Sequence, residues 1–376
     1  MTRIAVVLQG NPADASAWSG VPAGVISGLR AAGAEAVPIA ALFPGSRRVA
    51  RALRMSWVDQ CTNPVFSRAC GIAADRAIAA AGPLDGAVAI GSGYLLSTEV
   101  PTVTYEDMTV SQALALPDPT YESLGDRAAR RWRARQRHAY ERSRGCCVSS
   151  EWAARSVRDD YGIEAAKVHV VGFGRNSEPR AVARDWSTPR FLFVGGDWER
   201  KRGDAVVEAF AAVRERHPDA TLDLVGGHPP IDRPGVTGHG FVAMGTDEGR
   251  ERYASLLMAA TCLVLPSRYE PFGISYLDAG AWGVPSIGTT VGAAASAIGD
   301  GGRVVSPENA DELARAMLEI ADPDVARRLG ARAYERTDLF TWQAAAERIL
   351  RALRPPGVDV STLAPFLDSA ILERTA

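Results

Sequence analysis

Short runs of apolar residues, rich in valine and isoleucine, alternate along this chain with longer amphipathic stretches. Apolar runs of roughly four to eight residues are typical of buried strands, whereas longer stretches with apolar positions three and four residues apart are typical of helices. An alternation of the two predicts βαβ units, in which parallel strands are covered by helices. This pattern restricts the chain to the α/β class, and its 376 residues allow two or three domains.

Each half of the chain has its own series of alternating strands and helices. In the first half we predict strands at residues 4–8, 34–39, 87–90, 102–104, 146–149 and 168–171, and helices at 21–32, 65–80, 126–142 and 151–161. In the second half we predict strands at 191–194, 221–225, 263–265 and 284–287, and helices at 204–216, 247–260, 273–282, 310–320, 325–334 and 342–353. Periodicity is lost between Gly174 and Pro189, which predicts a linker there.

Two such halves predict two Rossmann-like domains, over residues 1–180 and 181–355, whose parallel sheets face an interdomain cleft. Parallel sheets bind ligands outside the carboxyl ends of their strands. We therefore expect the binding site in that cleft.

The composition excludes several classes of protein. Hydrophobic residues make up 47% and charged residues 23% of the chain, which is the profile of a globular protein, and the net charge of −2 gives no sign of a nucleic-acid partner. The longest nearly unbroken apolar run, Leu256–Leu265, is about half the ~20 residues that span a membrane. The first apolar run is too short for a secretory signal, so we expect a cytoplasmic protein.

The cysteines and histidines give no sign of a metal site. The five cysteines are irregularly spaced and predict reduced, mostly buried thiols. The five histidines form no pair at ligand spacing, so no metal ion is predicted.

The densest signal for a binding site is the segment PSRYEPFGI, which follows a predicted strand and leads into a predicted helix. The first N–H groups of a helix are unpaired and its dipole is positive there, so a helix start near Gly273 favours a phosphate. Glu270 lies in this loop and Asp278 lies eight positions later, so the two acids can reach opposite ends of one ligand. The alternative is that Glu270 caps the helix and Asp278 is a solvated helical residue.

A second loop, GGDWERKRG, follows the strand predicted at 191–194. It places three consecutive cations, Arg200, Lys201 and Arg202, between a strand and a helix. A run of charges is usually a solvated face, but this run lies where a parallel sheet contacts its ligands. It also contains one of the chain's two lysines. The two loops together favour an anionic ligand.

The stretches PSRYEPFGISYLDAG and VGGDWERKRGDAVVEAF resemble the retaining nucleotide-sugar glycosyltransferases of family 4, also called group 1, which have the GT-B fold of two Rossmann-like domains. The resemblance covers most of the chain and is strongest over residues 191–302. The family's signature is two glutamates separated by seven residues; here the second is Asp278. The resemblance implies that Glu270 contacts the transferred sugar and that Asp278 binds the ribose hydroxyls. It also implies that the amides of Phe272, Gly273 and Ile274 hold sugar hydroxyls or the diphosphate.

The same resemblance implies that Lys201 neutralises the diphosphate. The family's usual arginine after the first glycine is Gly196 here, so we predict that Arg200 supplies that charge, with Arg202 as the alternative. The backbone near Phe241 and Val242 is predicted to bind the base.

In the first domain the match to the family is partial. Ser19-Gly20 resembles the first glycine-rich loop, which makes Gly20 a predicted substrate-binding residue. Where the family commonly has a His-Asp pair, this chain reads Tyr105-Glu106-Asp107. We predict Glu106, or alternatively Asp107, near the reacting sugar; capping of the following helix is an equal alternative. The GT-B resemblance also implies a C-terminal helix within residues 356–376 that crosses back to the N-terminal domain.

Taken with these residues, the resemblance implies a retaining hexosyltransferase, and we expect it to be metal-independent. Its donor would be a UDP- or GDP-sugar, which is a co-substrate, so no cofactor is predicted. Its acceptor would be a hydroxyl group on a glycan, a glycolipid or another lipid-linked compound, or a small natural product. Lys201 and Arg200, with the helix start at Gly273, would offset the charge on the departing diphosphate.

Three other functions share some of these sequence features. The main alternative is a catalytically inactive regulatory subunit that binds a nucleotide sugar. A nicotinamide dehydrogenase is disfavoured because the first strand lacks a following Gly-x-Gly-x-x-Gly. A glycosidase also uses paired carboxylates but needs no cations for a diphosphate.

Two arginine-rich stretches, Arg47–Trp57 and Arg127–Arg144, are compatible with contact to a membrane surface. We favour a solvated helical face for both; the alternative is a surface for lipid, as in peripheral membrane contact, or for an acidic acceptor.

Overall fold

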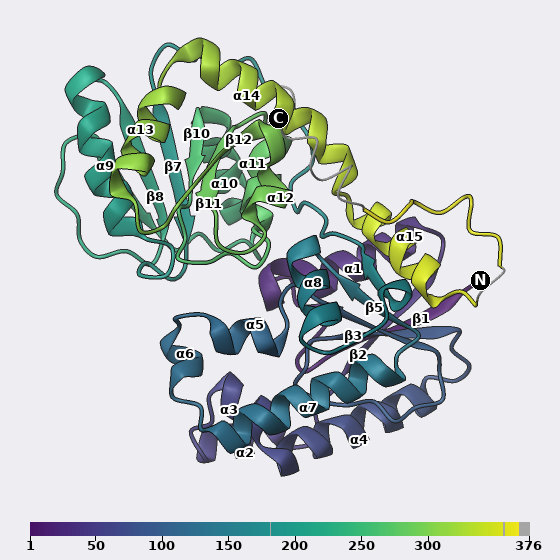
Figure 1. Ribbon diagram of the computed structural model, residues 1–376. Coiled ribbons are helices and arrows are strands. Elements are labelled where there is room, and N and C mark those ends of the chain that lie inside the picture. Colours follow the sequence, from purple (N-terminus) through teal and green to yellow (C-terminus); the bar gives the residue numbers. More distant parts are fainter. Residues whose placement is uncertain (181, 356–357, 368–376) are drawn as a thin grey trace. The chain divides into compact units, whose positions relative to one another are not determined.

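The computed structural model describes residues 1–180, 182–355 and 358–367, and the chain divides into two compact units (Figure 1). Unit 1 comprises residues 1–174 and the described residues from Trp342 onward, and unit 2 comprises the described residues within 175–341. Each unit contains one six-stranded sheet in which all neighbouring strands are parallel. The α/β prediction is therefore confirmed.

The sheet of unit 1 has the strand order β2-β1-β3-β4-β5-β6. Its strands are β1 (Arg3–Leu8), β2 (Glu35–Ala40), β3 (Gly86–Ile90), β4 (Thr102–Glu106), β5 (Gly145–Val148) and β6 (Val168–Val170). Its α-helices are α1 (Val21–Ala31), α2 (Ser46–Ala52), α3 (Trp57–Thr62), α4 (Pro64–Ala80), α5 (Val110–Ala115), α6 (Pro119–Glu122), α7 (Asp126–Arg142), α8 (Glu151–Asp159) and α15 (Trp342–Leu353). Two 3₁₀ turns, η1 (Ala17–Gly20) and η2 (Ala165–Lys167), complete it.

The sheet of unit 2 has the strand order β12-β11-β10-β7-β8-β9. Its strands are β7 (Arg190–Gly195), β8 (Thr221–Gly226), β9 (Val236–Gly240), β10 (Cys262–Val264), β11 (Ser286–Thr289) and β12 (Gly302–Val305). Its helices are α9 (Gly203–Arg216), α10 (Asp247–Ala259), α11 (Ile274–Ala281), α12 (Ala294–Ile298), α13 (Ala310–Ile320) and α14 (Pro323–Arg336), with 3₁₀ turns η3 (Gly299–Gly301) and η4 (Thr337–Leu339).

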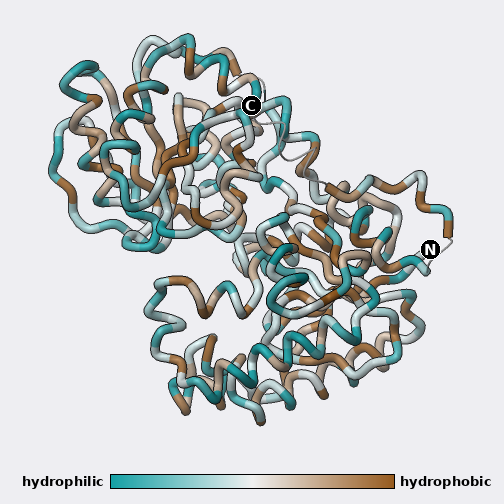
Figure 2. Tube along the Cα trace, in the orientation of Figure 1, coloured by the Kyte–Doolittle hydropathy of each residue, from teal (hydrophilic) through white to brown (hydrophobic). Residues whose placement is uncertain are grey.

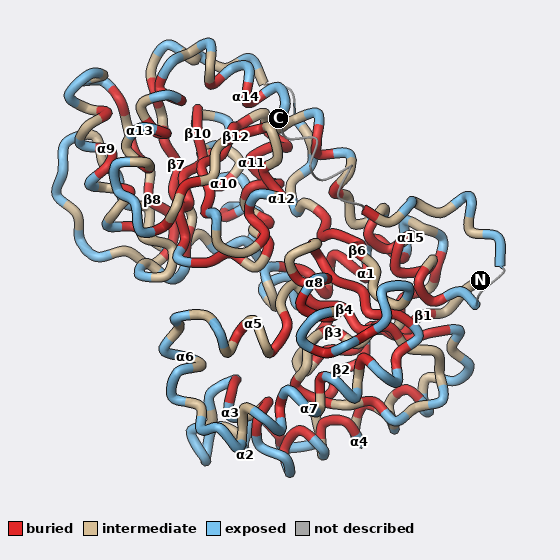
Figure 3. Tube along the Cα trace, in the orientation of Figure 1, coloured by how far each residue is buried: buried red, intermediate tan, exposed pale blue. Residues whose placement is uncertain are grey.

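The core of each unit lies along its sheet. The hydrophobic residues are concentrated in the interior of each unit (Figure 2), and the strands are its most continuously buried segments (Figure 3). All four residues of β5 are buried, as a parallel strand covered on both faces requires. The five cysteines are buried and free, as predicted.

Elements that the sequence did not predict are short or rich in glycine. Strand β9 reads VTGHG and lies at the sheet edge, where glycine weakens the strand pattern. The stretch from Arg47 to Trp57 is not one helix, because α2 ends at Ala52 and α3 begins anew with Ser56 as its cap. The continuous amphipathic helix that membrane contact would need at this stretch is therefore absent.

The predicted domain boundaries require correction at the C-terminal end. Helix α15, which was assigned to residues 181–355 of the second domain, belongs to unit 1. It packs against α1, where an added Cβ on Gly24 would lie 2.1 Å from the Trp342 ring and one on Gly28 would lie 2.0 Å from the Trp342 carbonyl oxygen. The two glycines let the helices approach closely. Helix α15 itself therefore makes the return to unit 1.

The described residues after α15 also lie on unit 1, but they form no helix. Leu367 is buried and its N–H donates to the Val170 carbonyl at 2.9 Å. Arg351 donates from its guanidinium to the carbonyls of Val360, Leu363 and Ala364. Those carbonyls bond to a side chain instead of a helical backbone, so the predicted helix is wrong for residues 358–367. The rest of that prediction lies outside the described residues.

The contact between α1 and α15 gives a prediction with an unusual sign. Alanine normally stabilises a helix interior by about 1 kcal/mol relative to glycine. Because a methyl group on Gly28 would meet the Trp342 carbonyl, we expect Gly28→Ala to lower the free energy of unfolding of unit 1 by at least ~1 kcal/mol. The control is Ser27→Ala, an exposed neighbour, which should change it by less than about 0.5 kcal/mol. Urea unfolding of both variants tests the contact, which a stabilised Gly28→Ala would contradict.

Candidate active site

The loops that follow β7 and β10 meet at the centre of the sheet in unit 2. These two strands are neighbours, and the chain continues outward from β7 through β8 and from β10 through β11. Such a reversal of strand order opens a crevice at the carboxyl edge, where ligands of doubly wound sheets bind. The two loops that the sequence singled out lie on either side of this point.

Lys201 and Glu270, one from each loop, form an ion pair between Nζ and Oε2. Their side chains are only 12% and 9% exposed. Burial lowers the pKa of Lys201, and the charge of Glu270 opposes that effect. The charge that was predicted to hold a diphosphate and the acid that was predicted to contact a sugar are thus in direct contact.

Each partner keeps polar atoms for a ligand. Among the described residues, Glu270 is the only hydrogen-bond partner of the Lys201 ammonium, which has three donors. Both side-chain bonds of Glu270, from Lys201 and from Ser267 Oγ at 3.3 Å, go to Oε2. The other oxygen, Oε1, has no partner in the described part of the chain.

The backbone of Glu270 is fixed by the loop after β11. Its N–H donates to the Val291 carbonyl at 3.0 Å, and its carbonyl accepts from the Ala293 N–H at 2.8 Å. Gly292 lies between them with φ of +101°, and an added Cβ there would lie 2.2 Å from the Glu270 carbonyl oxygen. Sequence reasoning missed this support, since only an isolated glycine marked it.

Arg200 joins the same two loops from the other side. Its guanidinium carbon lies 5.2 Å from the centre of the Tyr269 ring, and its Nη1 donates to the Tyr269 carbonyl at 3.2 Å. It also pairs with Asp197 at 3.6 Å. The alternative cation, Arg202, pairs instead with Glu308 at 3.5 Å. Of the two arginines, Arg200 is therefore the one that contacts the Glu270 loop.

The helices that begin at this point have no side-chain cap. Helix α9 follows β7 with Arg202 as its N-cap residue, and α11 follows β10 with Gly273 in that position; neither residue caps its helix with its side chain. By contrast, Thr246 caps α10 and Asn309 caps α13, both of which follow edge strands. The uncapped helix starts leave backbone N–H groups for an anion. They also show that Glu270 is not the N-cap residue of α11.

The predicted residues at the start of α11 are positioned by packing. Gly273 has φ of +91°, and a Cβ there would lie 2.4 Å from the Tyr276 ring. Phe272 is buried, with its ring centre 5.9 Å from that of Phe340. Ile274, two residues later, is also buried. Their side chains face the core, so only their backbone amides could serve a ligand.

Asp278 is buried and holds the segment that enters unit 2. Its Oδ1 accepts from the N–H groups of Asn176 and Ser177 at 2.7 and 2.8 Å. Burial raises its pKa to about 6, although these hydrogen bonds lower it. Its predicted contact with ribose stays a prediction.

Phe241 and Val242 follow β9 at the same edge. The Phe241 side chain is 76% exposed, and its ring lies 3.8 Å from where a Cβ on Gly196 would stand and 3.2 Å from one on Gly227. Both glycines follow the last residues of their strands, so an aromatic face lies beside open backbone there. Val242 is half-buried.

Unit 1 has its own cluster at the carboxyl edge. Gly20 is the N-cap residue of α1 with φ of +86°, and it follows Trp18 and Ser19, which also have positive φ. Glu106, the last residue of β4, is buried and accepts hydrogen bonds at Oε2 from Gln136 and from the Tyr140 hydroxyl. Burial raises the pKa of Glu106 to about 8. The capping alternative is wrong for Glu106, because Thr109 caps α5.

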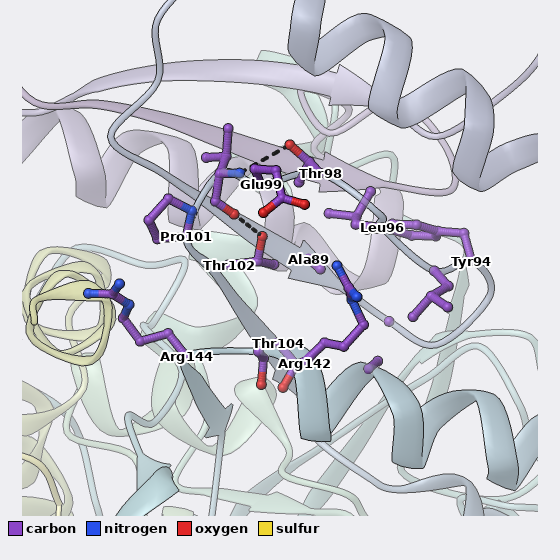
Figure 4. Close-up of a pocket in the computed structure, with 15 residues that line it drawn as sticks. Ala89, Tyr94, Leu96, Thr98, Glu99, Pro101, Thr102, Thr104, Arg142 and Arg144 are labelled. Carbon is purple, nitrogen blue, oxygen red and sulfur yellow. Dashed lines mark hydrogen bonds between the residues drawn. The ribbon is translucent and has the colours of Figure 1, made fainter.

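Described residues of unit 1 line two of the cavities in the structure. One, of about 390 Å³, is lined by Glu106, Asp107 and several aromatic residues that sequence reasoning did not connect with them. The other, of about 370 Å³, lies between the loop before β4 and the end of α7, and Arg142, Arg144 and Glu99 are among its lining residues (Figure 4). None of the predicted site residues lines the second cavity.

Comparison with known proteins now identifies unit 2. Residues 188–322 match the family described as "Glycosyl transferases group 1". These residues form a group 1 glycosyltransferase domain. The resemblance seen in the two motifs is thereby confirmed, since both motifs lie within this group 1 domain.

The matches to curated relatives are longer than the group 1 domain. D-inositol 3-phosphate glycosyltransferase of Kribbella flavida is 29% identical over 221 residues, which cover 52% of this chain and 52% of that protein. Mannosylfructose-phosphate synthase of Agrobacterium fabrum is 27% identical over 243 residues, which cover 56% of this chain and 52% of that protein. The chain spans about half the length of the curated relatives it matches.

Solved structures show the fold of most of the chain. The structure of sucrose-phosphate synthase from Thermosynechococcus elongatus matches with a TM-score of 0.66 and 20% identity, and the match covers 93% of this chain and 98% of that one. The fold is GT-B, as the resemblance implied.

In residues 1–180, 182–355 and 358–367, no three or more His, Cys, Asp and Glu side chains are grouped so that they could hold a metal ion. No helix in the same residues has the length and apolar character needed to cross a membrane.

Asp278 gives a prediction for the pH dependence of stability. Its pKa is about 6 in the folded group 1 domain and 3.8 in the reference state, so between these values the folded state holds a proton that the unfolded state has lost. Stability must therefore fall as the pH rises from about 4 to 6, by roughly 3 kcal/mol for this group. Asp278→Asn removes that titration and keeps an oxygen for the two N–H groups.

We expect the free energy of unfolding of unit 2, measured in urea from pH 4 to 7, to be flatter for Asp278→Asn than for the parent. Asp219→Asn, a substitution at an exposed acid of the same unit, should follow the parent profile. Identical slopes for all three proteins would show that the Asp278 carboxyl titrates normally.

Proposed function

We propose that the protein is a retaining glycosyltransferase that moves a hexosyl group from a UDP- or GDP-sugar to a hydroxyl group of an acceptor. The observation that carries the proposal is the buried Lys201–Glu270 pair, which lies at the strand-order reversal within the group 1 domain. The relatives named above are a glycosyltransferase and two sugar-phosphate synthases, which supports transfer of a sugar.

In this proposal the empty donors of Lys201 bind the diphosphate. The ammonium keeps its contact to Glu270 through one N–H and offers the others to phosphate oxygens. Arg200 and the uncapped starts of α9 and α11 add positive potential on the same side. Together they stabilise the negative charge that develops on the departing nucleotide diphosphate.

Glu270 then serves the sugar end of the donor. Its free Oε1 accepts a sugar hydroxyl, and the carboxylate stays oriented because Ser267, Lys201 and the Gly292 loop hold it. Retention, which the family resemblance implies, requires the acceptor to attack from the side of the leaving group. The donor is a co-substrate, and the proposal includes neither a metal ion nor a cofactor.

The remaining predicted residues fit the two ends of the substrates. We assign the exposed face of Phe241 and the backbone at Val242 to the base, and Asp278 to the nucleoside end. We assign Gly20 and Glu106 in unit 1 to the acceptor side. The acceptor in this proposal is a hydroxyl group of a glycan, a lipid-linked compound or a small molecule.

The role of Lys201 is tested by nucleotide affinity. Lys201→Ala removes a charge-assisted contact and should weaken binding of UDP or GDP by at least ~1.5 kcal/mol, which is about tenfold in Kd. The matched control is Lys167→Ala, since the other lysine donates to the Glu141 carbonyl in unit 1 and should leave affinity unchanged. Calorimetry that found equal affinities would remove Lys201 from the site.

The role of Glu270 is tested by the rate of transfer. Glu270→Gln should keep the fold and the affinity for the nucleotide diphosphate but lower kcat by 10²-fold or more, because a contact to the reacting sugar acts mainly in the transition state. Glu308→Gln, at a largely exposed acid that pairs with Arg202, is the matched control. Transfer by Glu270→Gln at the parent rate would exclude this loop as the reaction centre. A parent protein that binds the nucleotide sugar but never transfers or hydrolyses it would favour the inactive regulatory subunit.

A further inference from the structure

The cavity of about 390 Å³ in unit 1 lies where ligands of parallel sheets bind. Its lining includes Trp18 from the loop after β1, Gly91 and Ser92 after β3, and Glu106 at the end of β4. In the order β2-β1-β3-β4, the chain departs in opposite directions from β1, so this cavity stands at the strand-order reversal of unit 1. We call it the aromatic pocket.

Four aromatic side chains line the aromatic pocket: Trp18, Trp57, Tyr121 and Trp132. The ring centre of Trp132 lies 5.9 Å from that of Trp57 and 6.4 Å from that of Tyr121. Trp132 is buried, and its indole N–H donates to Ser92. Trp57 is 41% exposed, so one wall of the pocket is open to an incoming ligand.

Trp18 is held at the pocket by unusual backbone geometry. Its φ is +47°, a conformation that non-glycine residues rarely adopt. Its ring lies 3.1 Å from where a Cβ on Gly91 would stand, so glycine at this position leaves room for the ring. Strained backbone of this kind clusters at binding and active sites.

Two carboxyl groups, Glu106 and Asp107, stand beside the hydroxyl groups of Ser92 and Thr109 in the lining of the aromatic pocket. Glu106 is only 4% exposed, and within the described residues its two hydrogen bonds go to Oε2, which leaves Oε1 without a partner. Asp107 also lines the pocket. No lysine, arginine or histidine is among the described residues that line it.

We propose that the aromatic pocket binds the acceptor, and that this acceptor is an unphosphorylated polyhydroxylated ring such as a pyranose or a cyclitol. This inference rests on the proposed function, whose acceptor class it narrows.

The chemistry of the lining favours such a ring over a phosphorylated one. The C–H faces of a sugar or cyclitol carry partial positive charge and stack on aromatic faces, whose quadrupole is negative. A carboxyl group accepts hydrogen bonds from ring hydroxyls. A phosphate would face two carboxyl groups and four aromatic rings and would find none of the cationic donors that bind it elsewhere.

Two arginines of unit 1, Arg142 and Arg144, line the other cavity and not the aromatic pocket (Figure 4). That cavity includes Thr102 and Thr104 of β4 and has Gly91 in common with the aromatic pocket, whereas Glu106, the last residue of β4, lines the aromatic pocket alone. By this inference the chain takes an acceptor without a phosphate group. Several of its relatives, by contrast, are named for sugar or inositol phosphates.

The test compares acceptors in pairs that differ only by a phosphate. The pairs are D-glucose and glucose 6-phosphate, myo-inositol and inositol 3-phosphate, and D-fructose and fructose 6-phosphate. Binding of each is measured by saturation-transfer NMR on the full chain in the presence of UDP or GDP, and transfer is measured wherever a nucleotide sugar is consumed. We expect at least one unphosphorylated member to bind at least tenfold more tightly than its phosphorylated partner.

Variants of Trp57, at the open wall, test whether the ring binds in the aromatic pocket. Trp57→Ala should weaken binding of the unphosphorylated ring at least tenfold and leave the affinity for the nucleotide diphosphate unchanged. Trp57→Lys should shift the preference toward the phosphorylated member, because it adds the missing cation. Leu53→Ala and Leu53→Lys are the matched controls, since Leu53 is 66% exposed, lies four residues earlier and does not line the pocket. They should behave as the parent.

A preference for the phosphorylated members would overturn the inference. So would the absence of binding by both members of every pair, or a Trp57→Ala protein that binds the rings as the parent does. The Lys201-dependent affinity for the nucleotide diphosphate is measured on the same preparations. If that affinity is present, these failures concern the acceptor alone, whereas its absence would overturn the proposed function.

Discussion

The parallel direction of all neighbouring strands is the constraint on which the two candidate sites depend. In each sheet, the carboxyl ends of the strands lie at one edge, so every loop that follows a strand reaches that edge. The reversal of strand order then leaves two loops side by side without a crossing helix between them. In unit 2 the loops bring Lys201 to Glu270, and in unit 1 they bring Trp18 to Gly91. Residues about 70 positions apart in the sequence become neighbours for this reason alone.

The Lys201–Glu270 pair also shows how a buried site can hold charges before a ligand arrives. An unpaired charge at this depth would be costly, and each partner removes that cost for the other. The surrounding bonds come from two loops: Ser267 lies in the loop after β10, and Val291 and Ala293 lie in the loop after β11. The carboxylate is thus fixed in place without using its second oxygen. Such preorganisation reduces the rearrangement that binding would require.

Much of the fold could be predicted because hydrophobic periodicity reports burial directly. Strands such as β1 and β5 are buried almost throughout, and the sequence shows them as apolar runs. Strand β9, with its glycines, and the helix break between Ala52 and Trp57 could not be recognised, because exposed and short elements carry little periodicity. The assignment of α15 failed for another reason: an amphipathic helix shows that it has an apolar face but not which unit covers it.

The candidate site was predictable to the extent that it is local in sequence. The loops with Lys201 and Glu270 each carry a dense motif, and their closeness follows from the parallel sheet. The supports of these residues, Gly292 and Tyr276, could not be found, since they act through backbone shape and packing. The same holds for the aromatic pocket, whose tryptophans come from three separate segments. Only the fold brings Trp57, at the end of an arginine-rich stretch, to the same cavity as Glu106.

The place of α15 in unit 1 has a consequence for how the protein is made. The described residues of unit 2 lie in the sequence between Gly174 and Trp342, so the ribosome completes residues 175–341 before it delivers α15 of unit 1. Until then the face of α1 that carries Gly24 and Gly28 is not covered by α15. The last strand of unit 1, β6, is synthesised more than 150 residues before α15. Unit 2 can therefore reach its native state on the nascent chain while unit 1 must wait. The first part of the protein to be translated is the last to be finished.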